Sequence, residues 1–199
     1  MTTFFNEALK KRRSIYSLGK DLPQKNAEIV EIIKEAIKES PSAFNSQSVK
    51  AVITFGASSD AIWDITADIL ETQVPKEAFA KTKEKLASFA AGQGTILFYT
   101  DTVIVKELQD KFPLYAQNFP IWAEQALGGA QQAVWTALAQ EGIGASLQHY
   151  NPLIDDALAA KFDVPTSWQL RGQMPFGSIK QEAQAKDYLA DEERFKIFE

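Results

Sequence analysis

The sequence of 199 residues contains no cysteine, which excludes disulfide bonds, thiolate metal sites and cysteine nucleophiles. It has a single histidine, His149, so a zinc site would have neither a second imidazole nor a thiolate. No segment approaches the roughly 20 apolar residues that a membrane-spanning helix needs. Residues 1–10 carry Glu7 and no long apolar run, which is unlike a secretory signal. We therefore expect a soluble cytoplasmic protein without a metal site.

Basic residues are also fewer than acidic ones. The sequence has 21 Lys and Arg and 26 Asp and Glu, which gives a net charge of −5. Proteins that bind nucleic acid usually carry a basic surplus, so that class of partner is not expected. A small anionic ligand is still compatible with this balance, since a few arginines can gather locally in an acidic protein. The length predicts one domain that spans residues 1–199.

Apolar spacing and turn residues predict helices that alternate with strands. Asp101 is expected to cap a helix, as is one of Ser58, Ser59 and Asp60. The pattern indicates an α+β or α/β sandwich with a central sheet of four or five strands. The predicted helices begin or run near residues 4–12, 29–37, 60–70, 75–91, 121–140 and 151–152 onward, and the predicted strands cover 50–55, 95–100, 145–148 and 168–173.

The predicted helix 121–140 contains Gly128 and Gly129 in its interior. Each glycine there costs about 1 kcal/mol relative to alanine. Close approach of a second helix is one reason to retain them. The residues alone leave two interpretations open, a helix buried within a monomer and a helix in a subunit interface.

Two polar segments stand out as candidate binding sites. Arg12, Arg13, Ser14 and Tyr16 follow the first predicted helix, and residues 41–48 form a turn rich in amides and hydroxyls. Arginine binds phosphate through a rigid fork of donors, so the two segments together suit an anion that also carries ring acceptors, such as flavin mononucleotide. The alternatives are a basic helix end that complements its dipole and a loop satisfied by its own side chains.

Four blocks in this order and spacing resemble the nitroreductase family of flavoproteins, in particular its short branch of bacterial copper-induced and fungal fatty-acid-signalling members. The blocks are residues 12–16, residues 41–48, residues 142–152, and Met174-Pro175-Phe176-Gly177 with Lys186. The resemblance implies an α+β fold, a three-layer α-β-α sandwich with a mostly antiparallel sheet. It also implies a homodimer whose interface contains the long helix.

The same resemblance implies bound FMN, with residues 41–48 reaching it from the opposite subunit. Tyr16 stands where many relatives have a basic residue. A backbone N–H of His149 or Tyr150 would approach flavin N5. The implied cofactor contacts are Arg12, Arg13, Ser14, Tyr16, Ser42, Phe44, Asn45, Gln47, Leu147, Gln148, His149, Tyr150 and Lys186.

Four aromatic residues, Phe112, Tyr115, Phe119 and Trp122, are dense enough to form either a packed core or a gate over flat substrates. The resemblance implies an FMN-dependent enzyme that uses NAD(P)H as co-substrate and reduces nitroaromatics or quinones. No dinucleotide fingerprint is present, because both Gly-x-Gly pairs lack the third glycine. The alternative is a flavin-binding regulatory or redox-sensing protein whose turnover is incidental.

Overall fold

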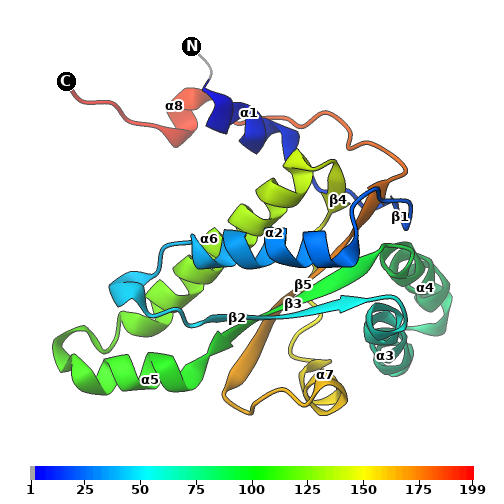
Figure 1. Ribbon diagram of the computed structural model, residues 1–199, viewed down its shortest axis with the longest axis horizontal. Helices are drawn as coiled ribbons and strands as arrows, with labels where there is room; N and C mark the ends of the chain where they lie inside the picture. Colours follow the sequence, from blue (N-terminus) through cyan, green and yellow to red (C-terminus); the bar gives the residue numbers. More distant parts are fainter. Residues whose placement is uncertain (1–2) are drawn as a thin grey trace.

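The computed structural model describes residues 3–199 and contains a five-stranded sheet (Figure 1). The strands are β1 (Leu18–Gly19), β2 (Val49–Phe55), β3 (Gly94–Asp101), β4 (Ile143–Ala145) and β5 (Trp168–Ile179). The strand order is β1-β5-β3-β2, β4 also pairs with β5, and every pairing is antiparallel. This confirms the predicted α+β class and its antiparallel sheet.

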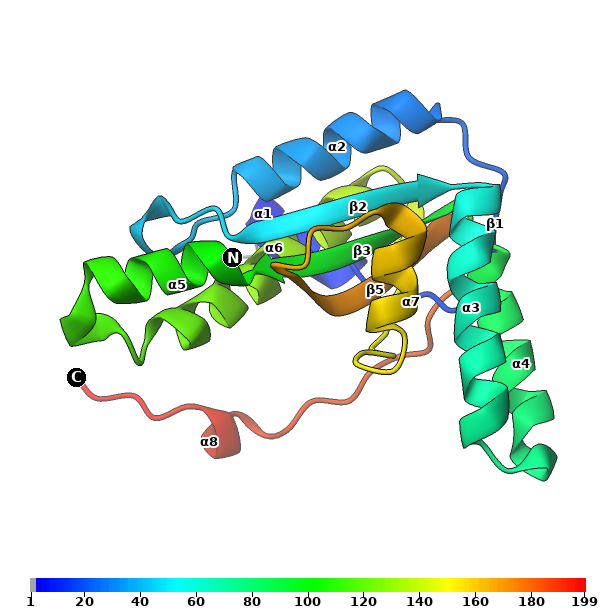
Figure 2. The ribbon, with the colours of Figure 1, turned by 90° about the horizontal axis from the view of Figure 1, so that it is seen from below.

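Helices cover both faces of the sheet, which makes three layers. On one face lie α2 (Asn26–Lys38) and α6 (Phe119–Gln140), and on the other lie α3 (Ala57–Gln73), α4 (Lys76–Ala90) and α7 (Asp155–Phe162) (Figures 1 and 2). The remaining helices are α1 (Phe4–Lys11), α5 (Thr102–Lys111), the 3-10 turns η1 (Ala43–Asn45) and η2 (Pro113–Tyr115), and the short α8 (Asp191–Arg194).

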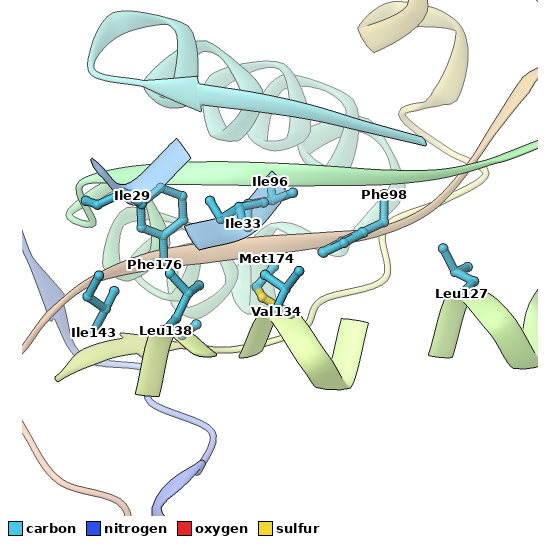
Figure 3. Close-up of a cluster of buried hydrophobic side chains, with 11 residues drawn as sticks. Ile29, Ile33, Ile96, Phe98, Leu127, Val134, Leu138, Ile143, Met174 and Phe176 are labelled. Atoms are coloured by element: carbon cyan, nitrogen blue, oxygen red, sulfur yellow. The ribbon is translucent and has the colours of Figure 1, made fainter. Parts of the chain in front are cut away.

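Each face of the sheet has its own apolar core. In the first core, Ile33 of α2 and Val134 and Leu138 of α6 pack on Ile96 and Phe176 of the sheet (Figure 3). In the second, Trp63, Phe89 and Leu158 pack on alternate strand residues such as Leu97 and Tyr99. The alternation of Ile96, Leu97, Phe98 and Tyr99 between the two cores explains why all eight positions of β3 are buried.

Four local predictions differ from the structure. Gly56, and none of residues 58–60, precedes α3 as its cap residue. The strand expected at 145–148 is β4 at Ile143–Ala145, and β5 continues beyond residue 173 to Ile179. The helix expected to start at Asn151-Pro152 begins at Asp155, because residues 151–154 form a turn.

Other boundaries agree with prediction. Asp101 caps α5, with its carboxylate accepting a hydrogen bond from the Val103 N–H at 3.2 Å. The long helix ends at Gln140, two residues before Gly142, whose φ of +75° favours glycine. The two-residue strand β1 was missed, since a segment that short has no periodicity to detect.

Candidate functional site

A cavity of about 550 Å³ opens beside the segment that follows α1. Five of the predicted cofactor contacts line it together, although they come from opposite ends of the chain. They are Arg12, Arg13, Ser14, Tyr16 and Lys186, joined by Ser17 and residues 181–185. The tertiary structure thus brings the predicted N-terminal block and the predicted lysine to one place.

The guanidinium of Arg12 is the most informative group in this first cavity. It lies 4.6 Å from the centre of the Trp135 ring, and its buried Nε has no hydrogen-bond partner. Desolvation lowers the pKa of Arg12, and the charge of Arg13 lowers it further. Among residues 3–199, no carboxylate forms an ion pair with either arginine. A bound anion would relieve both effects, so this cavity fits a phosphate group.

Arg13 ties the C-terminal segment to this cavity. Its Nη2 donates to the carbonyl oxygen of Gln184 at 2.5 Å, which holds residues 181–186 against the N-terminal block. Lys186 is exposed, and its ammonium lies 4.8 Å from the ring centre of Tyr188. One nitrogen of Arg13 is therefore already hydrogen-bonded within the chain, whereas the buried Nε of Arg12 has no hydrogen-bond partner among residues 3–199.

Trp135 of α6 belongs to this site and was not predicted from the sequence. Its indole N–H donates to the carbonyl oxygens of Arg13 at 3.2 Å and Ala145 at 3.1 Å, and its ring stacks against Arg12. The Ile15 N–H also donates to the Ala145 carbonyl, at 2.9 Å. A tryptophan in an apolar helix reads as a core residue, so the sequence holds no signal for this role.

The second predicted block forms a strained loop at the other end of α6. Phe44, Asn45 and Gln47 all have positive φ values, of 57°, 50° and 51°. Such residues cost on the order of 1–3 kcal/mol each and tend to cluster at functional sites. The Ser42 hydroxyl stabilises the loop by accepting a hydrogen bond from the Gln47 N–H at 3.1 Å. Ser42 and Phe44 line a second cavity, of about 430 Å³, with Trp122.

The four predicted aromatic residues gather around Phe44. The ring of Phe44 lies 4.8 Å from Phe112, 5.4 Å from Phe119, 6.3 Å from Trp122 and 6.5 Å from Tyr115, measured between centres. Phe119 is buried in a small core, while Phe44 and Tyr115 are exposed. The cluster therefore combines both interpretations, a packed base and an open aromatic face.

One protomer does not bring the two cavities together. Trp135 lies at the first and Trp122 at the second, and their 13-position separation along α6 corresponds to roughly 20 Å. Figure 1 shows η1 near the start of α6 and the segment after α1 near its end. The predicted contacts thus fall into separate groups, at the first cavity, in the loop 42–47 beside the second cavity, and in residues 147–150, which line neither cavity.

Residues 147–150 run beside β5 as an extended segment. Leu147 packs on the first core, Gln148 is buried, and His149 is exposed. The Gln148 side chain donates to the Ser146 hydroxyl at 3.0 Å. The Tyr150 N–H donates to the Gln173 side chain at 2.8 Å, and burial raises the pKa of the Tyr150 phenol.

Two further findings concern metal ligands and membrane-spanning helices. Among residues 3–199, no three His, Asp or Glu side chains gather in a way that could hold a metal ion. No helix in that range has the length and apolar character needed to cross a membrane.

Comparison with known proteins supplies the family context. A model of the nitroreductase family matches residues 9–178. The nitroreductase FRM2 of Saccharomyces cerevisiae is 36% identical over 172 residues, which cover 85% of this chain and 85% of that protein. The nitroreductase CinD of Lactococcus lactis, solved with nicotinic acid, superposes with a TM-score of 0.92 at 47% identity, over 98% of this chain and 100% of that one.

Other solved structures extend the comparison. CinD has also been solved with 4-nitrophenol, with a TM-score of 0.89 and 46% identity over 98% of this chain and 100% of that one. A protein of Desulfovibrio desulfuricans in complex with FMN shares the fold, with a TM-score of 0.69 and 20% identity over 100% and 99% of the two chains.

Trp135→Phe should lower the free energy of unfolding by about 1–2 kcal/mol, because two hydrogen bonds are lost while a ring stays beside Arg12. Trp122→Phe on the same helix is the matched control, since the Trp122 indole N–H has no acceptor among residues 3–199. Urea denaturation followed by circular dichroism measures both. Equal stability losses in the two variants would contradict the bridging role of Trp135.

Proposed function

The chain belongs to the nitroreductase family, and we propose that it is an FMN-dependent oxidoreductase that uses NAD(P)H to reduce nitroaromatic compounds or quinones. The observation that carries this proposal is the Arg12–Arg13 pair, which forms no ion pair with a carboxylate of residues 3–199 and lines a cavity of about 550 Å³ in a net acidic protein. The CinD complex with 4-nitrophenol supports nitroaromatics as one substrate class. A cytoplasmic location stays a prediction.

The first cavity would hold the phosphate of FMN. Arg12 and Lys186 supply positive charge, Ser14 supplies a hydroxyl, and Arg13 contributes the part of its fork that Gln184 does not use. Tyr16 is exposed in the same cavity and can donate one hydrogen bond to a ring carbonyl, without the charge of a basic residue. Leu147, Gln148, His149 and Tyr150 would follow the edge of the flavin ring.

FMN, when bound, would supply the redox chemistry, hydride transfer through its N5 atom from NAD(P)H to the second substrate in a ping-pong cycle. The chain itself then has no need of a side-chain acid or base at the site. Its tasks are to bind the phosphate, to present backbone N–H groups to the ring and to stack flat substrates. Phe44, Phe112, Tyr115 and Trp122 would perform the last task, with Phe119 as their buried support.

A second copy of the chain would complete the site. The outer face of α6 is uncovered, because a methyl group added at Gly128 or Gly129 would meet no other part of the described chain within 4 Å. Beside Gly129 an apolar cavity of about 390 Å³ runs past Phe5, Leu9 and Ala133. A partner packed on this face in a two-fold symmetric dimer would bring its own loop toward the first cavity. The residues of that loop are Ser42, Phe44, Asn45 and Gln47. This supports a homodimer with FMN at the interface.

The purified protein tests the proposal directly. It should be yellow, should release FMN on denaturation, and should oxidise NAD(P)H continuously when a nitroaromatic or a quinone is added. Bleaching that stops after one equivalent of NAD(P)H would instead support the regulatory or redox-sensing alternative. A colourless protein that also fails to bind added FMN would overturn both.

Arg12→Ala should weaken FMN binding by roughly one to two orders of magnitude, because a hydrogen bond to a charged group contributes about 1.5–3 kcal/mol. Turnover at saturating FMN should largely recover, since Arg12 positions the cofactor without transferring a proton. Arg13→Ala is the matched control and should weaken binding less, because Arg13 is already engaged by Gln184. Titration of apo-protein with FMN, followed by flavin fluorescence, measures both. Unchanged affinity in both variants would remove this block from the site.

Gly129→Glu should shift the protein toward monomer and lower its retention of FMN, because a charge would enter the apolar face of α6. Ala80→Glu, on an exposed position of α4, adds the same charge away from that face and should change neither property. Analytical ultracentrifugation with flavin absorbance reports mass and FMN content together. A monomeric Gly129→Glu protein with normal FMN affinity would contradict the shared site.

A further inference from the structure

A small polar cavity lies between the end of α2, the loop 42–47 and the start of β2, and we call it the lysine cavity. Its volume is about 200 Å³, less than half that of the first or the second cavity. Five of its nine lining residues carry an ammonium, hydroxyl or amide group, and none carries a carboxylate. The five are Lys38, Ser40, Ser42, Gln47 and Lys50.

Neither lysine of this cavity forms an ion pair with a carboxylate of residues 3–199. The ammonium of Lys50 donates to the Gln47 carbonyl oxygen at 3.2 Å, which leaves donors for a ligand because an ammonium has three. Lys38 lies in the last turn of α2, and the adjacent Glu39 lines the apolar cavity beside Gly129 instead. In a chain of net charge −5, a cavity lined by two lysines and no carboxylate favours an anionic group.

The Ser42 hydroxyl can add a neutral donor. Its oxygen accepts the Gln47 N–H at 3.1 Å, and its O–H has no acceptor among residues 3–199. The Ser40 hydroxyl differs, because it already donates to the Ala36 carbonyl oxygen at 2.7 Å. An ionised carboxylate only accepts hydrogen bonds. Two lysines and one open hydroxyl therefore supply the donors that a carboxylate needs.

The lysine cavity adjoins the aromatic cluster. It shares Pro41, Ser42 and Ala126 with the second cavity, which Phe44 and Trp122 line. The rings there suit a flat ligand, whereas the lysines suit a negative charge. A ring held in the second cavity would thus have a cationic cavity beside it.

We propose that the lysine cavity binds the acidic substituent of an aromatic acceptor whose ring lies in the second cavity, so that nitrobenzoates are preferred over neutral nitroaromatics. The inference rests on the proposed function, which supplies the acceptor chemistry, and deepens it by naming a substrate class. A carboxylate attached directly to the ring suits two cavities that share lining residues. The phosphates of a dinucleotide suit them less, because a ribose separates those phosphates from the nicotinamide ring.

Isothermal titration calorimetry of protein incubated with FMN tests the site without turnover. Wild-type protein should bind 4-nitrobenzoate about tenfold more tightly than the neutral 4-nitrobenzamide, because two lysines each contribute the effect of a partly exposed ion pair, about threefold. Equal affinities for the acid and the amide would overturn the proposal. Preferential binding of the acid without its reduction by NAD(P)H would overturn the proposed function and still support the anion site.

Lys38→Met and Lys50→Met locate the site, because each removes a charge and keeps an apolar stem of similar length. Each should weaken 4-nitrobenzoate binding by about threefold, and the double variant should bind the acid and the amide equally. In steady-state assays, KM for 4-nitrobenzoate should rise while kcat holds, since the lysines contact a part of the substrate that does not react. Lys34→Met is the matched control, because Lys34 lies one turn earlier on α2, pairs with Glu31 at 2.6 Å and does not line the lysine cavity. A double variant that folds, as judged by circular dichroism, and keeps the wild-type preference would overturn the proposal.

Two other binding modes have distinct signatures. If Arg12→Ala at saturating FMN lost the preference for the acid while the double lysine variant kept it, the carboxylate would bind in the first cavity. If the double variant raised KM for NADPH and left KM for NADH and for 4-nitrobenzoate unchanged, the lysine cavity would bind the 2′-phosphate of the dinucleotide. Either result would overturn the proposal.

Discussion

Helix α6 packs one face on the sheet through residues such as Val134 and Leu138, and its outer face around Gly128 and Gly129 is not covered by residues 3–199. The rest of the site depends on this arrangement. Because the helix is 22 residues long, it separates the cavity beside Trp135 from the cavity beside Trp122 by roughly 20 Å. The chain therefore does not bring the two cavities together. The proposed second copy would pack on the uncovered face of the same helix.

Charge in the first cavity is concentrated against the overall balance of the chain. The net charge is −5, yet Arg12, Arg13 and Lys186 line one cavity, and Arg12 is partly desolvated there. Bringing like charges together out of water costs free energy unless an anion compensates for it. Trp135 holds this arrangement by stacking on Arg12 while its N–H fixes the backbone of Arg13. These features of the cavity fit the anion that the proposed function requires.

Strain and order are distributed differently in two of the predicted contact segments. Residues 44–47 hold three non-glycine residues at positive φ, and the aromatic cluster packs around the Phe44 ring that this loop presents. Residues 146–150 are instead held on β5 by hydrogen bonds, the last of which is accepted by the side chain of Gln173. The loop thus presents an exposed aromatic ring, whereas the segment beside β5 is ordered by its neighbouring strand.

The class of fold could be predicted from the sequence alone, whereas the candidate contacts named there stay predictions. Periodic apolar residues predicted the helices and the buried strand at 95–100, since burial on one face leaves a repeat in the chain. Local chemistry also predicted the cap at Asp101. Short or non-periodic elements were predicted less accurately. The two-residue strand β1 was not predicted, and α7 begins three residues later than expected from Pro152.

How these residues are combined in space depends on the tertiary fold. Trp135 and Gln173 read in sequence as an ordinary core residue and an ordinary strand residue, because their roles come from partners that are 122 and 23 positions away. The separation of the two cavities also follows from the tertiary fold, since the length and packing of α6 set it. The local sequence pattern predicts which residues are buried and which residues cap helices. Hydrogen bonds between residues distant in sequence, and the distances between cavities, depend on the folded chain.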